Sequence, residues 1–223
     1  MLGVETIKIT HDILKRSSKI DEFKGLWSGL ETYTTGLQIL SDVAAHGAKV
    51  QRVLAPLKDR DITPEIIQML HAVQTGGKGA SPYKSDVNHL PVMGADNPNG
   101  FLDTAPPQQV EQLMDKLLAW LNESLFSDDI HPLIVIAVFV AVFLQISPFA
   151  QGNIRTVRFL VLLLMMKANY SYAPYVPLDR IMNDRADDIY KALSHNQTSL
   201  ETGKADWSVW LTCFFDVLAN QAD

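Results

Sequence analysis

The segment of the chain best suited to chemistry lies between residues 147 and 158, where polar and cationic residues separate two apolar stretches. It reads Ser147-Pro-Phe-Ala-Gln-Gly-Asn-Ile-Arg-Thr-Val-Arg158. Free backbone N–H groups at a helix start attract anions, and Arg155 and Arg158, three residues apart, share one helix face. The spacing alone leaves two interpretations open: a phosphate-binding turn, or a helix–turn–helix corner whose arginines pair with acids or cap carbonyls.

Two apolar helices are expected to hold this segment. The first begins at His131-Pro132 and runs to about Ile146, and the second contains the apolar run 159–166. The apolar stretch 132–144 covers about 13 residues, fewer than the roughly 20 that a membrane-spanning helix needs. A buried helical hairpin therefore explains both runs, and no contact with a membrane is predicted.

Further helices are predicted along the rest of the chain. Thr63-Pro64-Glu65 is a strong helix start, because a hydroxyl cap is followed by proline and then by an acid in the first turn. Apolar periodicity predicts helices around 20–27, over 37–57 with an interruption near Gly47, after Pro107, after Pro177 and over 207–218. The aromatic stripe of the last segment is interpreted as core, with a dimer surface as the alternative.

Residues 75–104 are rich in glycine and proline, which indicates turns rather than helix. Within this segment, residues 83–92 show some alternation and are predicted to form a short β-hairpin. A loop of this length in a compact domain is often functional.

Composition favours one ordinary globular domain over residues 1–223, with an N-terminal helical segment at 1–60, a flap loop at 75–104 and core motif helices at 131–170. The net charge of −6 offers no basic surface for nucleic acid. Cys213 is the single cysteine and no signal-peptide pattern opens the sequence, so a cytoplasmic protein is expected. No cysteine–histidine cluster suggests a metal site.

The segment 147–158 resembles the Fic family signature, His-x-Phe-x-(Asp/Glu)-Gly-Asn-(Gly)-Arg-x-x-Arg. Other stretches are also similar to the family: 20–27, 106–122, 131–133, 172–176 and 207–211. The resemblance extends over roughly residues 19 to 218. It implies an all-α Fic-like fold with a small β-hairpin flap.

The resemblance also implies a chemistry, the transfer of AMP from ATP to a protein hydroxyl. That reaction uses a base of near-neutral pKa and a carboxylate that holds Mg²⁺. Backbone amides and arginines take up the phosphate charge. The flap is implied to hold the target segment by strand addition; its candidate residues here are Tyr83, Val87 and His89.

This chain matches only part of the signature. Five matching residues are assigned to nucleotide or phosphate binding: Phe149, Gly152, Asn153, Arg155 and Arg158. Three positions depart from it. Ser147 stands at the base position, although a hydroxyl is a poor base at pH 7. Gln151, a neutral amide, stands at the metal-ligand position. Ile154 replaces the second glycine, and a β-branched side chain tolerates positive φ poorly.

Two further assignments concern residues outside the motif. Many Fic proteins carry an inhibitory helix whose glutamate pairs with the second arginine, and Gln51 is the equivalent expected here, with a plain helical surface residue as the alternative. His131 is interpreted as a helix-start residue, about 24 Å from Ser147 along a helix at 1.5 Å per residue. His89 and His195 lie in loop-like sequence and would replace the lost base only through tertiary folding.

The leading interpretation is a Fic pseudoenzyme with lost or strongly reduced AMP transfer, which keeps a phosphate, nucleotide or peptide site and acts as a binding or regulatory module. The alternative is an active protein adenylyltransferase. ATP is the candidate ligand, and Gln151 weakens the expectation of Mg²⁺. A protein target at the flap and a homo-oligomer remain open as partners.

Overall fold

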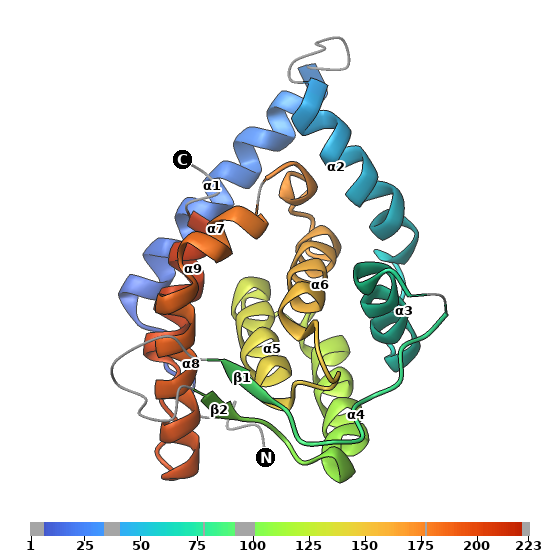
Figure 1. Ribbon diagram of the computed structural model, residues 1–223. Helices are drawn as coiled ribbons and strands as arrows, with labels where there is room; N and C mark the ends of the chain where they lie inside the picture. The colour runs from blue at the N-terminus through green and yellow to red at the C-terminus, as the bar shows by residue number, and fades with distance from the viewer. Residues whose placement is uncertain (1–6, 34–40, 78, 92–100, 177, 220–223) are drawn as a thin grey trace.

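A computed structural model describes residues 7–33, 41–77, 79–91, 101–176 and 178–219 (Figure 1). Its α-helices are α1 His11–Tyr33, α2 Ser41–Leu54, α3 Pro64–Thr75, α4 Pro107–Ser124, α5 Pro132–Ile146, α6 Asn153–Lys167, α7 Leu178–Asp184, α8 Ala186–Glu201 and α9 Ser208–Ala219. Two short 3-10 helices are η2 Ala55–Leu57 and η3 Ala173–Tyr175. The strands are β1 His89–Pro91 and β2 Phe101–Asp103. The prediction of a mainly helical fold with a small hairpin is confirmed.

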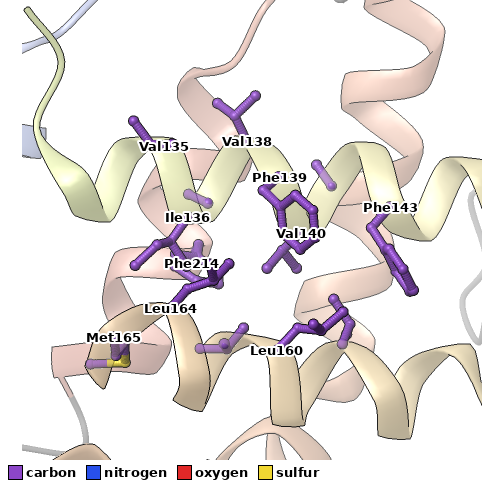
Figure 2. Packing of buried hydrophobic residues seen from close by; sticks show 14 of the residues in the cluster. Val135, Ile136, Val138, Phe139, Val140, Phe143, Leu160, Leu164, Met165 and Phe214 are labelled. Atoms are coloured by element: carbon purple, nitrogen blue, oxygen red, sulfur yellow. The ribbon is translucent and has the colours of Figure 1, made fainter. Parts of the chain in front are cut away.

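Helix α5 forms the centre of the core, and every residue from 133 to 144 in it is buried. It packs against α4, α6 and α9. In Figure 2 the side chains of Phe139 and Val140 face those of Leu160 and Leu164 on α6, and Phe214 of α9 belongs to the same cluster. No helix in the described ranges combines the length and apolar character that a bilayer crossing requires. The apolar runs therefore fill the core, as predicted.

Local start signals fix several helix boundaries. The Thr63 hydroxyl accepts a hydrogen bond from the backbone N–H of Ile66 and caps α3, which begins at Pro64. Hydrogen bonding with Thr63 lowers the pKa of Glu65 in the first turn. Helices α4 and α5 also begin at prolines, as predicted. One helix was expected after Pro177, whereas the structure has two, α7 and α8.

The aromatic stripe of α9 is core. Trp207, Trp210 and Phe215 are each at most 2% exposed, and the Trp210 indole N–H donates to the Ala137 carbonyl of α5 at 2.7 Å. Helix α9 also packs against α1 and α8. The core interpretation of this stripe is confirmed.

Helix α2 runs through Gly47 without the predicted interruption. The glycine serves a close approach instead, because a Cβ at this position would collide with the ring of Tyr175 on η3. Tyr175 in turn stacks on Trp27 of α1. The N-terminal helices are thus attached to the segment that follows α6.

The hairpin forms between segments that lie farther apart than predicted. Antiparallel pairing joins His89 to Asp103, Leu90 to Leu102 and Pro91 to Phe101. The predicted range 83–92 therefore contains one of the two strands, and the other strand comes from the end of the loop. Residues 84–88 are held in irregular backbone by contacts to the end of α5, described below, so they cannot supply a strand.

Candidate functional site

The loop from Ser147 to Gly152 joins α5 to α6 and borders a pocket of about 670 Å³. Helices α7 and α8 and the strand β1 supply other parts of the wall. Seven residues singled out from the sequence line this pocket: His89, Gln151, Gly152, Asn153, Ile154, Arg155 and Arg158. The structure thus brings the motif and one flap residue together around a single cavity.

Ser147, at the predicted base position, does not line the pocket. Its side chain is 0% exposed, and its hydroxyl donates to the Leu144 carbonyl at 2.6 Å. The residue caps the end of α5 in the left-handed conformation, with φ of 44°. This hydroxyl therefore completes a helix end and is directed away from any ligand in the pocket.

Hydrogen bonds with the side chains of Asn153 and Asn88 hold the backbone of the loop. The Asn153 side chain accepts from the Phe149 N–H at 2.9 Å and donates to the Phe149 carbonyl at 2.7 Å. The Asn88 amide donates to the carbonyls of Phe149 and Ser147, at 2.7 and 3.3 Å. Asn153 was assigned to phosphate binding from the sequence; its side chain is 5% exposed and bonded within the loop.

The side chain of Lys84 links two residues of the flap, Asn88 and Thr104, to the C-terminal end of α5. Its ammonium donates to Asn88 Oδ1 at 2.6 Å, to Thr104 Oγ1 at 2.8 Å and to the Ile146 carbonyl at 3.0 Å. Its backbone N–H donates to the Pro148 carbonyl. A cation is favoured at the C-terminal end of a helix, but the side chain is only 5% exposed. Burial therefore lowers the pKa of Lys84 to about 8.

The lowered pKa of Lys84 predicts a pH dependence of stability. In the unfolded chain the amine keeps its proton up to about pH 10.5, whereas in the folded chain it loses the proton near pH 8. Between these values the unfolded state binds more protons, so the free energy of unfolding should rise with pH. We expect urea denaturation to show this rise for the wild type relative to Lys84→Met. The exposed Lys116→Met should follow the wild type, and a pH-independent difference between wild type and Lys84→Met would contradict the assignment.

His71, on α3, contacts two residues of the loop. Its ring stacks on Phe149 with centroids 3.8 Å apart, and Nε2 lies 2.9 Å from the Gln151 carbonyl. Since a carbonyl only accepts, Nε2 carries the proton of this bond. Gly152 lies close to this ring with φ of 79°, and a Cβ at this position would lie 3.1 Å from His71 Nε2. Glycine is thus required at 152 both by conformation and by the approach of His71.

The two arginines of the motif both line the pocket. Arg155 is exposed, and Arg158 is half-buried, with Nη2 donating to Asn183 Oδ1 of α7 at 2.5 Å. They belong to the first turns of α6, close to its free N–H groups. This side of the pocket can therefore accept an anion.

Gln151 and Ile154 are the other two residues predicted from the sequence to depart from the family signature. Gln151 is exposed at the pocket edge and offers a neutral amide. Ile154 lies inside α6, and the described non-glycine residues with positive φ are Ser147 and Asn169. The expected conflict with positive φ at Ile154 is therefore absent, because the helix begins one residue earlier, at Asn153. Its side chain still fills space in the pocket wall.

Gln51, the expected equivalent of the inhibitory glutamate, contacts a different partner. Its Oε1 accepts from the Tyr175 hydroxyl at 3.1 Å, in an exposed contact between α2 and η3. Arg158 is bonded instead to Asn183. In this structure the second arginine of the motif thus has an amide partner from α7.

The three predicted flap residues lie in different environments. Val87 is 62% exposed, and His89 is exposed on β1, with Nδ1 3.2 Å from Asp103 Oδ1 on β2. Tyr83 packs against Phe149 with ring centroids 5.7 Å apart and a buried hydroxyl. Burial raises the pKa of Tyr83 to about 12. Tyr83 therefore supports the motif loop from within the protein.

The remaining histidines of interest are engaged elsewhere. His131 caps α5 by accepting from the Leu133 N–H, and its Nε2 lies 3.1 Å from Asp21 Oδ2. Its interpretation as a helix-start residue is confirmed. His195 lies in α8 rather than in a loop, with Nε2 3.3 Å from Asp206 Oδ2. Of the three histidines considered as substitutes for the base, His89 is the one that lines the pocket.

Sequence reasoning missed several residues of the site: His71, Lys84, Asn88, Asn183 and Tyr190. His71 follows the apolar positions Ile67 and Leu70 on the predicted α3, and a histidine on an apolar helix face is a signal that could have found it. The contacts of the other four depend on segments distant in sequence. No local pattern marks them.

Comparisons with known proteins agree with this geometry. Residues 61–165, from just before α3 through most of α6, match the Fic/DOC family. A Fic family protein from Desulfovibrio desulfuricans has a similar structure, with a TM-score of 0.66 and 18% identity over 97% of this chain and 74% of that chain. A Fic domain-containing signaling protein from Bacteroides thetaiotaomicron has a TM-score of 0.60, with 18% identity over 95% of this chain and 92% of that chain. The motif loop and the flap both fall within the residues that match the Fic/DOC family.

Proposed function

We propose that this chain is a Fic domain protein with lost or strongly reduced AMP transfer, and that it binds a phosphate-bearing ligand, such as a nucleotide, as a binding or regulatory module. The observation that carries the proposal is the burial and hydrogen bonding of the Ser147 side chain. Its hydroxyl is buried and bonded to Leu144, so the base position presents no proton acceptor to the pocket. Loss of a general base typically lowers a rate by about 10²–10⁴-fold.

Anion binding is supported by groups that do not depend on Ser147. Arg155, Arg158 and the start of α6 all border the pocket. Hydrogen bonds from Asn88, Asn153 and Lys84 hold the loop and the end of α5 in place. A binding site that is already ordered avoids part of the entropic cost of association.

The flap supports a second mode of binding, the addition of a peptide strand. Val87 and Phe101 are 62% and 56% exposed, and β1 and β2 form a two-stranded sheet. An extended peptide that pairs with a strand edge would place side chains against these apolar groups. This mode is compatible with an anion in the adjacent pocket.

Calorimetric titration with ATP tests the proposed anion site. We expect Arg158→Ala to weaken ATP binding by about 10–100-fold, since hydrogen bonds to charged groups contribute about 1.5–3 kcal/mol. Arg180→Ala is the matched control, because Arg180 is exposed on α7 and pairs with Asp184. Equal affinity of the wild type and Arg158→Ala would contradict the proposal. Bound ATP should also raise the thermal midpoint of the wild type.

The rival function is an active adenylyltransferase. The position of His89 favours this function. This histidine lines the pocket and faces Asp103, and a carboxylate that orients an imidazole is a common feature of catalytic bases. A radiolabelled ATP assay with candidate protein targets distinguishes the two functions. Transfer that is lost in His89→Ala would establish the rival, and no transfer above background supports the binding module.

A further inference from the structure

Asn88 helps to fix the direction of a peptide group at the edge of the pocket. Its Nδ2 donates to the Phe149 carbonyl at 2.7 Å and to the Ser147 carbonyl at 3.3 Å. The Phe149 carbonyl and the Ala150 N–H belong to one trans peptide group, so they point in opposite directions. Ala150 lines the pocket. The bond from Asn88 therefore helps to decide which way this N–H faces.

The side chain of Asn88 is oriented by two other residues of the flap. Its Oδ1 accepts from Lys84 Nζ at 2.6 Å and lies 2.6 Å from Thr104 Oγ1. An ammonium group donates hydrogen bonds and accepts none, so the amide atom next to Lys84 must be the oxygen. The amide nitrogen is then directed at the loop carbonyls. The charge of Lys84 thus selects the amide orientation that holds the loop.

The ammonium of Lys84 is fully engaged by oxygen atoms of the protein. Its three N–H donors match three acceptors, which are Asn88 Oδ1, Thr104 Oγ1 and the Ile146 carbonyl. The side chain is buried, and burial lowers its pKa to about 8. The Thr104 hydroxyl also lies 2.6 Å from the backbone carbonyl of Asn88. Both side chains therefore act on the pocket through Asn88.

We propose that Lys84 and Thr104 are positioning residues of the anion site, because they hold Asn88 and Asn88 holds the loop in the shape that accepts a phosphate group. This inference rests on the proposed anion site and names residues that set its affinity. Lys84 precedes β1 and Thr104 follows β2, so the two ends of the flap meet at this network. A loop that is already ordered loses less entropy when a ligand binds. Loss of the network should therefore weaken binding.

Calorimetric titration with pyrophosphate tests the role of the Thr104 hydroxyl. We expect Thr104→Val to weaken pyrophosphate binding by about 10-fold, because it removes an acceptor from a buried ammonium and a donor to Asn88. Thr104→Ser keeps the hydroxyl and should bind pyrophosphate like the wild type. Lys84→Met should weaken binding at least as much as Thr104→Val. Circular dichroism first shows that each variant is folded, and the threonine pair decides the test if Lys84→Met does not fold.

A double-mutant cycle separates positioning from general destabilisation. Asn88→Ala should also weaken pyrophosphate binding, and adding Thr104→Val to it should cause little further loss, since the two side chains act through one group. Thr202→Val is the matched control, because the Thr202 hydroxyl donates to the Ser199 carbonyl at the exposed end of α8. This control also loses one hydroxyl bond, and its affinity for pyrophosphate should equal that of the wild type.

The possible outcomes separate this inference from the function on which it rests. If the wild type does not bind pyrophosphate, the anion site is overturned and the inference with it. If the wild type binds and Thr104→Val binds equally well, the inference is overturned and the anion site stays in place. Equal weakening in Thr104→Ser or Thr202→Val, or additive losses in the double variant, also overturns the inference. Weakening in Thr104→Val that is restored in Thr104→Ser and absent on the Asn88→Ala background supports it.

Discussion

A variant that combines Ser147→His, Gln151→Asp and Ile154→Gly is expected to transfer AMP from ATP at least about 10²–10⁴-fold faster than the wild type, because the change supplies a general base. The backbone at 147 suits this change. Its φ of 44° lies in the left-handed region, where histidine is among the residues found more often than most.

The other two changes act on the ligand rather than on the base. Gln151→Asp supplies the carboxylate that Mg²⁺ requires, and Ile154→Gly removes a side chain from the pocket wall. Transfer is measured with radiolabelled ATP and candidate targets, after circular dichroism has shown that the variant is folded. Ser147→Ala is the control, and its background should equal that of the wild type. A folded triple variant without transfer would show that more than these three positions has been lost.

Trp210→Ala is expected to have the largest effect on stability, a loss of about 3–5 kcal/mol in the free energy of unfolding. The indole is 1% exposed and packs beside Phe214. Its N–H donates to the Ala137 carbonyl in the middle of α5. The substitution leaves a cavity between α9 and the central helix and also removes this bond.

Two neighbouring variants separate the contributions at Trp210. Trp210→Phe removes the N–H donor and keeps most of the apolar volume, so its loss should be smaller than that of Trp210→Ala. Val209→Ala, at a position 41% exposed on the same helix, should stay within about 0.5 kcal/mol of the wild type. Urea denaturation of all three provides the comparison, and a loss below about 1 kcal/mol for Trp210→Ala would contradict the core role of α9.

Local chemistry accounts for the parts of the fold that were predicted correctly. Thr63 caps α3, and prolines begin α4 and α5. Such signals act within one helical turn, so they can be read without knowledge of the packing. The length and apolar character of α5 likewise indicate a buried helix. The positions of Arg155 and Arg158 on one face of α6 follow from helical periodicity alone.

The hairpin shows where local reasoning fails. Alternation over 83–92 suggested two strands, yet Lys84 and Asn88 are bound to the end of α5, and β1 pairs with residues 101–103. The segment between the two strands, residues 92–100, lies outside the described residues. Alternation indicates where a strand can form, but it does not identify the partner of that strand.

The sequence by itself determined where several helices begin, the position of the motif loop and its similarity to the Fic signature, because each depends on neighbours within a few positions. Only the tertiary structure decided that Ser147 is turned into the end of α5 and that Arg158 is bonded to Asn183. The same holds for Gln151, whose carbonyl contacts His71 from 80 positions away. The physical reason is that hydrogen bonds and close packing between distant segments depend on how the helices pack together. The spacing of residues in the sequence does not specify that packing.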